Sequence, residues 1–151
     1  GKSFLPVLKG VSNAHRDYAF GIHNNIPEGS AYPIRSIRGQ RYKLLLNLAP
    51  DSSYYIKYMM NTAKKGSYWN TWVAMASSSP AVKKLTDRIV HRPAVEFYDL
   101  EKDPFEMNNL ATDPAHRKQI DNYTKLLKAW MQQQGDAAAR SRERAARFYG
   151  E

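Results

Sequence analysis

Apolar and polar residues alternate in several short stretches of this chain, and alternation at every second position is typical of β-strands with one buried face. Tyr18, Phe20 and Ile22 occupy such positions in one stretch, and Tyr42 to Leu48 repeats the pattern further along. Two of the stretches are joined by Gly39-Gln40, which predicts a hairpin. The predicted strands are residues 16–23, 32–38, 41–48 and 97–100.

Helical periodicity appears elsewhere, with apolar residues spaced three or four apart. The clearest case begins after the capping pair Asp113-Pro114 and ends at Gly135, and its apolar positions are Ile120, Tyr123, Leu127, Trp130 and Met131. Three shorter helices are predicted between the hairpin and the last strand. They are a helix capped by residues 51–53 and ended by Gly66, a second over residues 67–77, and a third from Ser79-Pro80 to residues 91–93.

Strands and helices are segregated along the chain, which favours an α+β fold. We predict a small, about four-stranded, antiparallel sheet packed against the long C-terminal helix, with a helical insertion between strands. Residues 1–135 would form this domain. Residues 136–151 are rich in alanine and arginine and read as a basic tail, either a weak helix or disordered.

Composition narrows the possible functions. The chain has 151 residues and no cysteine, so disulfides, zinc thiolate sites and a cysteine nucleophile are excluded within it. The net charge of +9 favours an anionic partner. No apolar run reaches the roughly 20 residues that span a bilayer, and no nucleic-acid motif is present, so neither a membrane nor a nucleic acid is expected as a partner.

Residues that could perform catalysis are not grouped in the sequence. Ser79-Pro80 is explained by a helix start, Asp121-Asn122 by the polar face of the long helix, and the histidines lack metal-ligand spacing. The acidic residues after the last strand (Asp99, Asp103, Glu106), together with Asn109, are interpreted as structural, with Asp103-Pro104 setting a turn. No catalytic residue and no metal ligand is therefore predicted in this chain.

Three segments, in order, resemble the C-terminal part of the sulfatases. They are the opening GKSFLPVLKG, the hairpin IRSIRGQRYKL and the later segment EFYDLEKDPFEMNNL. Residues 32–35 and Asn47-Leu48 are also similar to the heparan N-sulfatase (sulfamidase) branch. The nucleophile motif of the family has no counterpart here.

The resemblance implies a subdomain that packs on a sulfatase catalytic domain and helps to shape its sulfated-sugar pocket. It further implies calcium and a formylglycine nucleophile in the parent enzyme, an exported location, and no activity for this chain alone. Substrate contacts are expected from the loop after the first strand, at His23, Asn24 and Asn25, whose side chains suit sugar hydroxyls or sulfate. Arg35 is a further candidate because its fork matches a sulfate, whereas Arg38 should face the other side of the sheet.

Two alternatives to a sulfatase subdomain remain open. The charge alone is compatible with a polyanion-binding module, for instance for a glycosaminoglycan, that has no catalytic role. The tail of a related phosphatase or phosphonate monoester hydrolase would show the same motifs. If the chain is a sulfatase subdomain, the face that meets the catalytic domain is left exposed in the isolated chain. Leu5, Val7 and Leu8, which lack local partners, would belong to this face, which predicts self-association.

Overall fold

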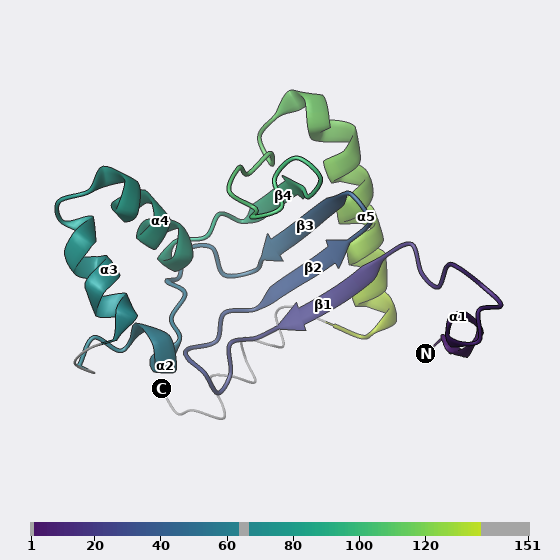
Figure 1. Ribbon diagram of the computed structural model, residues 1–151, viewed down its shortest axis with the longest axis horizontal. Coiled ribbons are helices and arrows are strands. Elements are labelled where there is room, and N and C mark those ends of the chain that lie inside the picture. The colour runs from purple at the N-terminus through teal and green to yellow at the C-terminus, as the bar shows by residue number, and fades with distance from the viewer. Residues whose placement is uncertain (1, 64–66, 137–151) are drawn as a thin grey trace.

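The computed structural model describes residues 2–63 and 67–136. A twisted antiparallel sheet forms the centre, one long helix crosses one of its faces, and a group of short helices lies beside it (Figure 1). The α+β architecture predicted from the sequence is therefore confirmed. The predicted tail falls almost wholly on residues 137–151, outside the described residues.

The sheet contains four strands in the order β1-β2-β3-β4, and every neighbouring pair is antiparallel. All four predicted strands are present: the first three are shorter than the alternating pattern suggested, and the last begins two residues earlier and ends one residue earlier than predicted. The register places Phe20, Ile37, Leu44 and Phe97 in one row across the sheet. The strands are β1 (Ala19–His23), β2 (Ile34–Arg38), β3 (Tyr42–Asn47) and β4 (Val95–Asp99).

The main core lies between this row and α5 (Arg117–Gln133). Ile120, Tyr123 and Leu127 of α5 are buried against the sheet, as their spacing predicted. The phenyl ring of Phe20 stacks on the indole of Trp130 at 4.8 Å between centroids. This contact joins the edge strand to the last turns of the helix. The predicted cap is also present, because the Asp113 side chain accepts the amide of Ala115.

A second, smaller core lies on the opposite face of the sheet. Its buried members are Tyr32, Ile34, Leu45, Ala49 and Tyr98. Ile34, Leu45 and Tyr98 alternate with the residues that face α5, so each central strand buries both of its faces. This explains the nearly continuous apolar run in β3.

The predicted helix between residues 54 and 63 is largely wrong. Only α2 (Lys57–Met60) is helical, and its cap position Ile56 is extended. Long-range backbone hydrogen bonds hold the preceding segment open: the amide of Tyr54 donates to Val90 and that of Lys57 to Glu28. These tertiary contacts override the local capping signal at residues 51–53. Gly66, the predicted end, lies outside the described residues.

The other two insertion helices match their predictions. In α3 (Tyr68–Ala76) the Ser67 hydroxyl accepts the amide of Asn70, and in α4 (Pro80–Val90) the Ser79 hydroxyl accepts that of Val82. The N-terminal segment forms only the short α1 (Leu5–Leu8). Across residues 2–63 and 67–136, no helix combines the length and apolar character needed to cross a bilayer.

The turn after β4 shows why its sequence is so rich in polar residues. The Asp103 carboxylate accepts the amides of Met107 and Asn108, at 2.9 and 2.7 Å. The Asn109 side chain accepts the amide of Phe97 and donates to the carbonyl of Val95. Asp103 thus closes the loop on itself and Asn109 fixes it to the edge of β4, which confirms the predicted turn at Asp103-Pro104 and the predicted backbone bonding of Asn109.

Candidate functional site

The loop between β1 and β2 brings the predicted site residues His23, Asn24 and Arg35 together. Arg35 lies on the α5 face of β2 and is almost completely buried, at 1% exposure. Its guanidinium donates to the Asn24 side chain at 3.0 Å and to the carbonyl of His23 at 3.4 Å. Arg35 therefore holds the end of β1 in place from the α5 face of the sheet.

The same guanidinium forms a two-point ion pair with Asp136, just beyond α5. Arg35 Nε lies 2.5 Å and a terminal nitrogen 2.9 Å from the two carboxylate oxygens. The hydrogen bonds from Arg35 lower the pKa of the Asp136 carboxyl, and burial opposes this only in part. The charge that could have matched a sulfate thus has an internal counterion.

Asn25 also points inward. Its backbone adopts a left-handed conformation (φ 61°), and its side-chain amide donates to the carbonyls of Ser30 and Tyr55. The residue is buried and connects the loop to the segment before α2. Asn is one of the few non-glycine residues that adopt this conformation readily, so its place in the turn follows from backbone geometry.

His23 and Asn24 are the two predicted site residues whose side chains are exposed to solvent. The His23 imidazole Nε2 lies 3.2 Å from the Tyr54 hydroxyl, and the rings are tilted with centroids 6.0 Å apart. Burial raises the pKa of the Tyr54 hydroxyl above its ordinary value. Arg38 is exposed on the other face of the sheet, as predicted.

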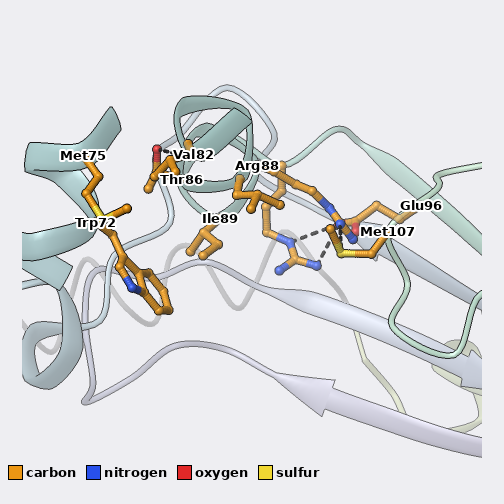
Figure 2. Close-up of a pocket in the computed structure, with 10 residues that line it drawn as sticks. Trp72, Met75, Val82, Thr86, Arg88, Ile89, Glu96 and Met107 are labelled. Carbon is orange, nitrogen blue, oxygen red and sulfur yellow. Dashed lines mark hydrogen bonds and ion pairs between the residues drawn. The ribbon is translucent and has the colours of Figure 1, made fainter. Parts of the chain in front are cut away.

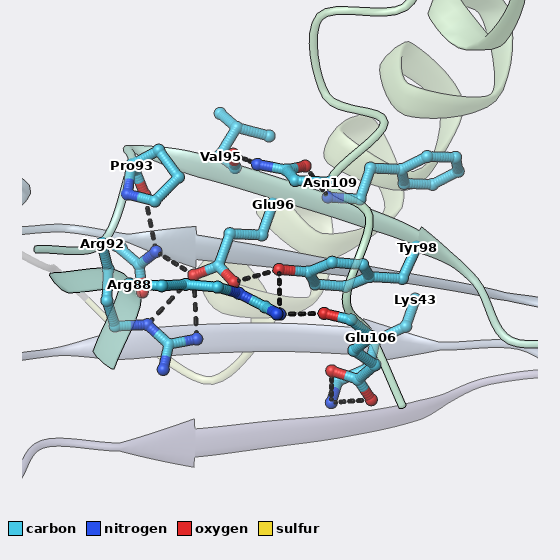
Figure 3. Close-up of polar contacts among 11 residues, drawn as sticks. Lys43, Arg88, Arg92, Pro93, Val95, Glu96, Tyr98, Glu106 and Asn109 are labelled. Atoms are coloured by element: carbon cyan, nitrogen blue, oxygen red, sulfur yellow. Dashed lines mark hydrogen bonds and ion pairs between the residues drawn. The ribbon is translucent and has the colours of Figure 1, made fainter. Parts of the chain in front are cut away.

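A second polar cluster, not predicted from the sequence, is centred on Glu96 (Figure 3). One Glu96 carboxylate oxygen accepts the Asn47 side chain at 2.6 Å and forms an ion pair with Arg92 at 2.8 Å. The other oxygen accepts the Tyr98 hydroxyl at 2.6 Å. Burial raises the pKa of Tyr98 well above its ordinary value, and its bond to Glu96 raises it further. This cluster ties the segment just after α4, which contains Arg92, to β3 and β4.

Arg88 lies next to this cluster, one helical turn before Arg92. It donates to the Tyr98 hydroxyl at 3.2 Å and to the backbone carbonyl of Glu106. The sequence signal for the cluster is the spacing of Arg88 and Arg92 at i, i+4, with Glu96 and Tyr98 on one strand face. That signal is common on surface helices, so it is weak by itself.

A cavity of about 530 Å³ opens beside Arg88, between α3, α4 and the loop after β4. Figure 2 shows Trp72 and Met75 on one side and Met107 near the arginine end. The remaining apolar lining residues are Val82, Leu85 and Ile89, and the buried Thr86 also lines the cavity.

None of these clusters provides the groups needed to cleave a sulfate ester. In the described part of the chain, no three histidine, aspartate or glutamate side chains gather as metal ligands. The calcium implied by the sequence resemblance was expected in the parent enzyme, and no site for it is assigned to the residues described here. The β1–β2 loop exposes the polar side chains of His23 and Asn24, and the α3–α4 cavity is lined mainly by apolar side chains.

Comparison with known proteins identifies sulfatases as the relatives. No family model matches the chain. An ulvan-active sulfatase of Formosa agariphila is 30% identical over 138 residues, covering 90% of this chain and 25% of that protein. A second ulvan-active sulfatase of the same organism is 26% identical over 140 residues, covering 91% and 22%. The chain thus spans about a quarter of the length of the curated relatives it matches.

Solved structures show the same fold. A 2-O GAG sulfatase superposes with a TM-score of 0.54 at 23% identity, over 89% of this chain and 20% of that one. A Bacteroides thetaiotaomicron protein described as a sulfatase gives 0.53 at 22% identity, with the same coverage. The resemblance to sulfatases is supported, whereas the heparan N-sulfatase branch is not.

Proposed function

We propose that this chain is the C-terminal subdomain of a sulfatase and packs on a catalytic domain outside these residues. The observation that carries the proposal is the extent of the match: 90% of the chain aligns with a sulfatase at 30% identity, yet accounts for 25% of that protein. The nucleophile and the calcium site would then belong to the remaining three-quarters. An exported location is part of the same proposal.

Within this subdomain, we assign substrate contact to His23 and Asn24. Their side chains are exposed, while Arg35 and Asp136 hold the backbone beneath them. A fixed backbone lowers the entropic cost of ordering a loop around a sugar. The substrate class is a sulfated polysaccharide, in keeping with the ulvan-active relatives, and the group removed is a sulfate ester or a sulfamate.

The test uses the longer enzyme that contains this chain. His23→Ala is expected to lower kcat/KM for sulfate release from a sulfated polysaccharide by about tenfold or more, since a hydrogen bond to a charged group contributes roughly 1.5–3 kcal/mol. Asn122→Ala, at an exposed polar residue of α5, is the control and should leave kcat/KM unchanged. Equal values for the two variants would remove His23 from the site. Sulfate release by residues 1–151 alone would refute the assignment of the chemistry to another domain.

A polyanion-binding module without catalysis is the second candidate, and the net charge of +9 favours it. This function predicts that the chain binds a sulfated polysaccharide tightly by itself, with an affinity that falls steeply as salt rises. Binding that is lost when residues 137–151 are removed would reduce this candidate to electrostatic attraction by the basic tail.

A further inference from the structure

The cavity between α3 and α4, here called the α3–α4 groove, gathers large apolar side chains that remain open to solvent. Trp72, Leu85, Met75 and Met107 line it and are 41%, 44%, 49% and 54% exposed. Single exposed apolar residues are common on protein surfaces, but several in one concavity mark a binding surface. The groove is therefore the strongest candidate for a contact that the chain itself does not complete.

The packing of α4 explains why the groove is open. Val82, Leu85 and Ile89 form the apolar face of this helix, and the sequence pattern predicts that such a face is buried. The two helices pack on each other, but they lie beside the sheet and not on its core (Figure 1). The apolar face of α4 is thus only partly covered by the described residues.

The charge around the groove is positive. Arg92 is paired with Glu96, whereas the hydrogen-bond partners described for Arg88 are neutral: the Tyr98 hydroxyl, the Glu106 carbonyl and the Met107 sulfur. On the far side of α4, a cavity of about 610 Å³ shares Arg88 and is lined by Lys83, Lys84 and His91. Asp87 offsets one of these charges through its ion pair with Lys83.

These features point to an occupant with apolar side chains and nearby carboxylates. A second copy of this chain suits the groove poorly, because each copy carries a net charge of +9. The arginine-rich residues 140–147 of this chain are also a poor occupant, because the positive charge around the groove would repel them. The relatives are about four times longer than the chain, so most of such a protein is available to supply the segment.

We infer that the α3–α4 groove is the docking site for an apolar segment with flanking Asp or Glu residues from the catalytic part of the longer enzyme. This inference rests on the proposed function and specifies which surface of the subdomain is covered. Apolar side chains fill the groove beside Trp72 and Leu85, and a carboxylate pairs with Arg88 or Lys84.

Cysteine labelling provides a direct test, because residues 1–151 contain no cysteine. Met75→Cys places a thiol in the groove. Phe105→Cys is the matched control, because Phe105 is 83% exposed and does not line the groove. Each variant is made in the chain and in the longer enzyme, and labelling of that one position is followed by mass spectrometry. We expect the longer enzyme to slow labelling at position 75 by about tenfold or more and to leave position 105 unchanged.

Carbodiimide cross-linking tests the charge, since it joins lysine amines only to carboxylates in contact with them. Lys84 should cross-link to an Asp or Glu outside residues 1–151. Equal labelling of position 75 in both forms overturns the inference. Protection that appears in the chain alone as its concentration rises identifies a second copy as the occupant and also overturns it.

Sulfate release by the same longer enzyme separates the two proposals. Release with an unprotected groove defeats only the docking inference. Protection of position 75 without release from any sulfated polysaccharide defeats the proposed function and leaves the docking contact in place.

Discussion

The ion pair between Arg35 and Asp136 should be a major determinant of stability, and Asp136→Asn tests this. The Arg35 side chain is 1% exposed and that of Asp136 is 10% exposed, so both charges are largely removed from water. Replacing the carboxylate with an amide leaves the guanidinium charge buried without this counterion. Removing one partner of a buried pair typically costs about 3–5 kcal/mol.

The expected loss lies at the lower end of that range. Arg35 keeps acceptors in Asn24 and the Ile34 carbonyl, and the asparagine retains one acceptor oxygen. We therefore expect the free energy of unfolding to fall by about 3 kcal/mol in urea titrations. For a chain of this size, that corresponds to a decrease in Tm of roughly 8–10 °C.

Asp121→Asn, within α5, is the control. Asp121 pairs with Arg117 at 3.2 Å, but the two side chains are 61% and 78% exposed. Breaking such an exposed pair should cost at most about 0.5 kcal/mol. If Asp136→Asn cost no more than Asp121→Asn, the reasoning about the buried pair would be refuted. The double variant Arg35→Met/Asp136→Leu should be more stable than Asp136→Asn, because it removes both buried charges.

The same pair predicts a pH dependence. Arg35 lowers the pKa of Asp136 in the folded state below the unfolded-state pKa, which is near 3.8. The ion pair therefore contributes fully to the free energy of unfolding above the unfolded-state pKa, and this contribution is lost as pH falls through the lower folded-state pKa. The difference in unfolding free energy between wild type and Asp136→Asn should therefore be constant from about pH 5 to pH 7 and shrink in stronger acid. A difference that grows on acidification would contradict this sign.

Two further stability predictions concern buried polar side chains. Asn25→Ala removes the hydrogen bonds to Ser30 and Tyr55 and places alanine, which tolerates a φ of 61° less well, in the left-handed conformation. We expect the free energy of unfolding in urea to fall by about 2–3 kcal/mol. Asn25→Gly should lose less, because glycine adopts this conformation readily. In Glu96→Gln an NH2 group replaces one of the two carboxylate oxygens that accept hydrogen bonds from Arg92 and Tyr98. We therefore expect the free energy of unfolding to fall by about 2–4 kcal/mol relative to wild type in the same titration. A cost below about 0.5 kcal/mol for either alanine or glutamine variant would show that these contacts do not stabilise the fold.

The strands and most helices could be predicted because their signals are local. The capping of α3 and α4 by Ser67 and Ser79 depends on residues that are neighbours in sequence, and the three-four spacing in α5 reflects packing against a single surface. The predicted helix before α2 failed for the opposite reason. Its segment is held extended by backbone bonds to Glu28 and Val90, which are distant in sequence.

The candidate site was only partly predictable for the same physical reason. Residue type identified His23, Asn24, Asn25 and Arg35 as polar groups near a turn, but could not separate those that face solvent from those that hold the turn. That distinction depends on Asp136, about 100 residues away in sequence, whose carboxylate meets the Arg35 guanidinium. The Glu96 cluster likewise joins residues from three separate elements.

By itself, the sequence determined the α+β class, the strand pairing by hairpin, the amphipathic long helix and the resemblance to sulfatases, because each depends on local spacing or on short motifs. Only the tertiary structure decided which charges are neutralised internally, which polar side chains remain exposed at the β1–β2 loop, and that α3 and α4 leave an apolar groove open. These properties depend on desolvation and on contacts between distant segments, and neither is encoded in the pattern of neighbouring residues.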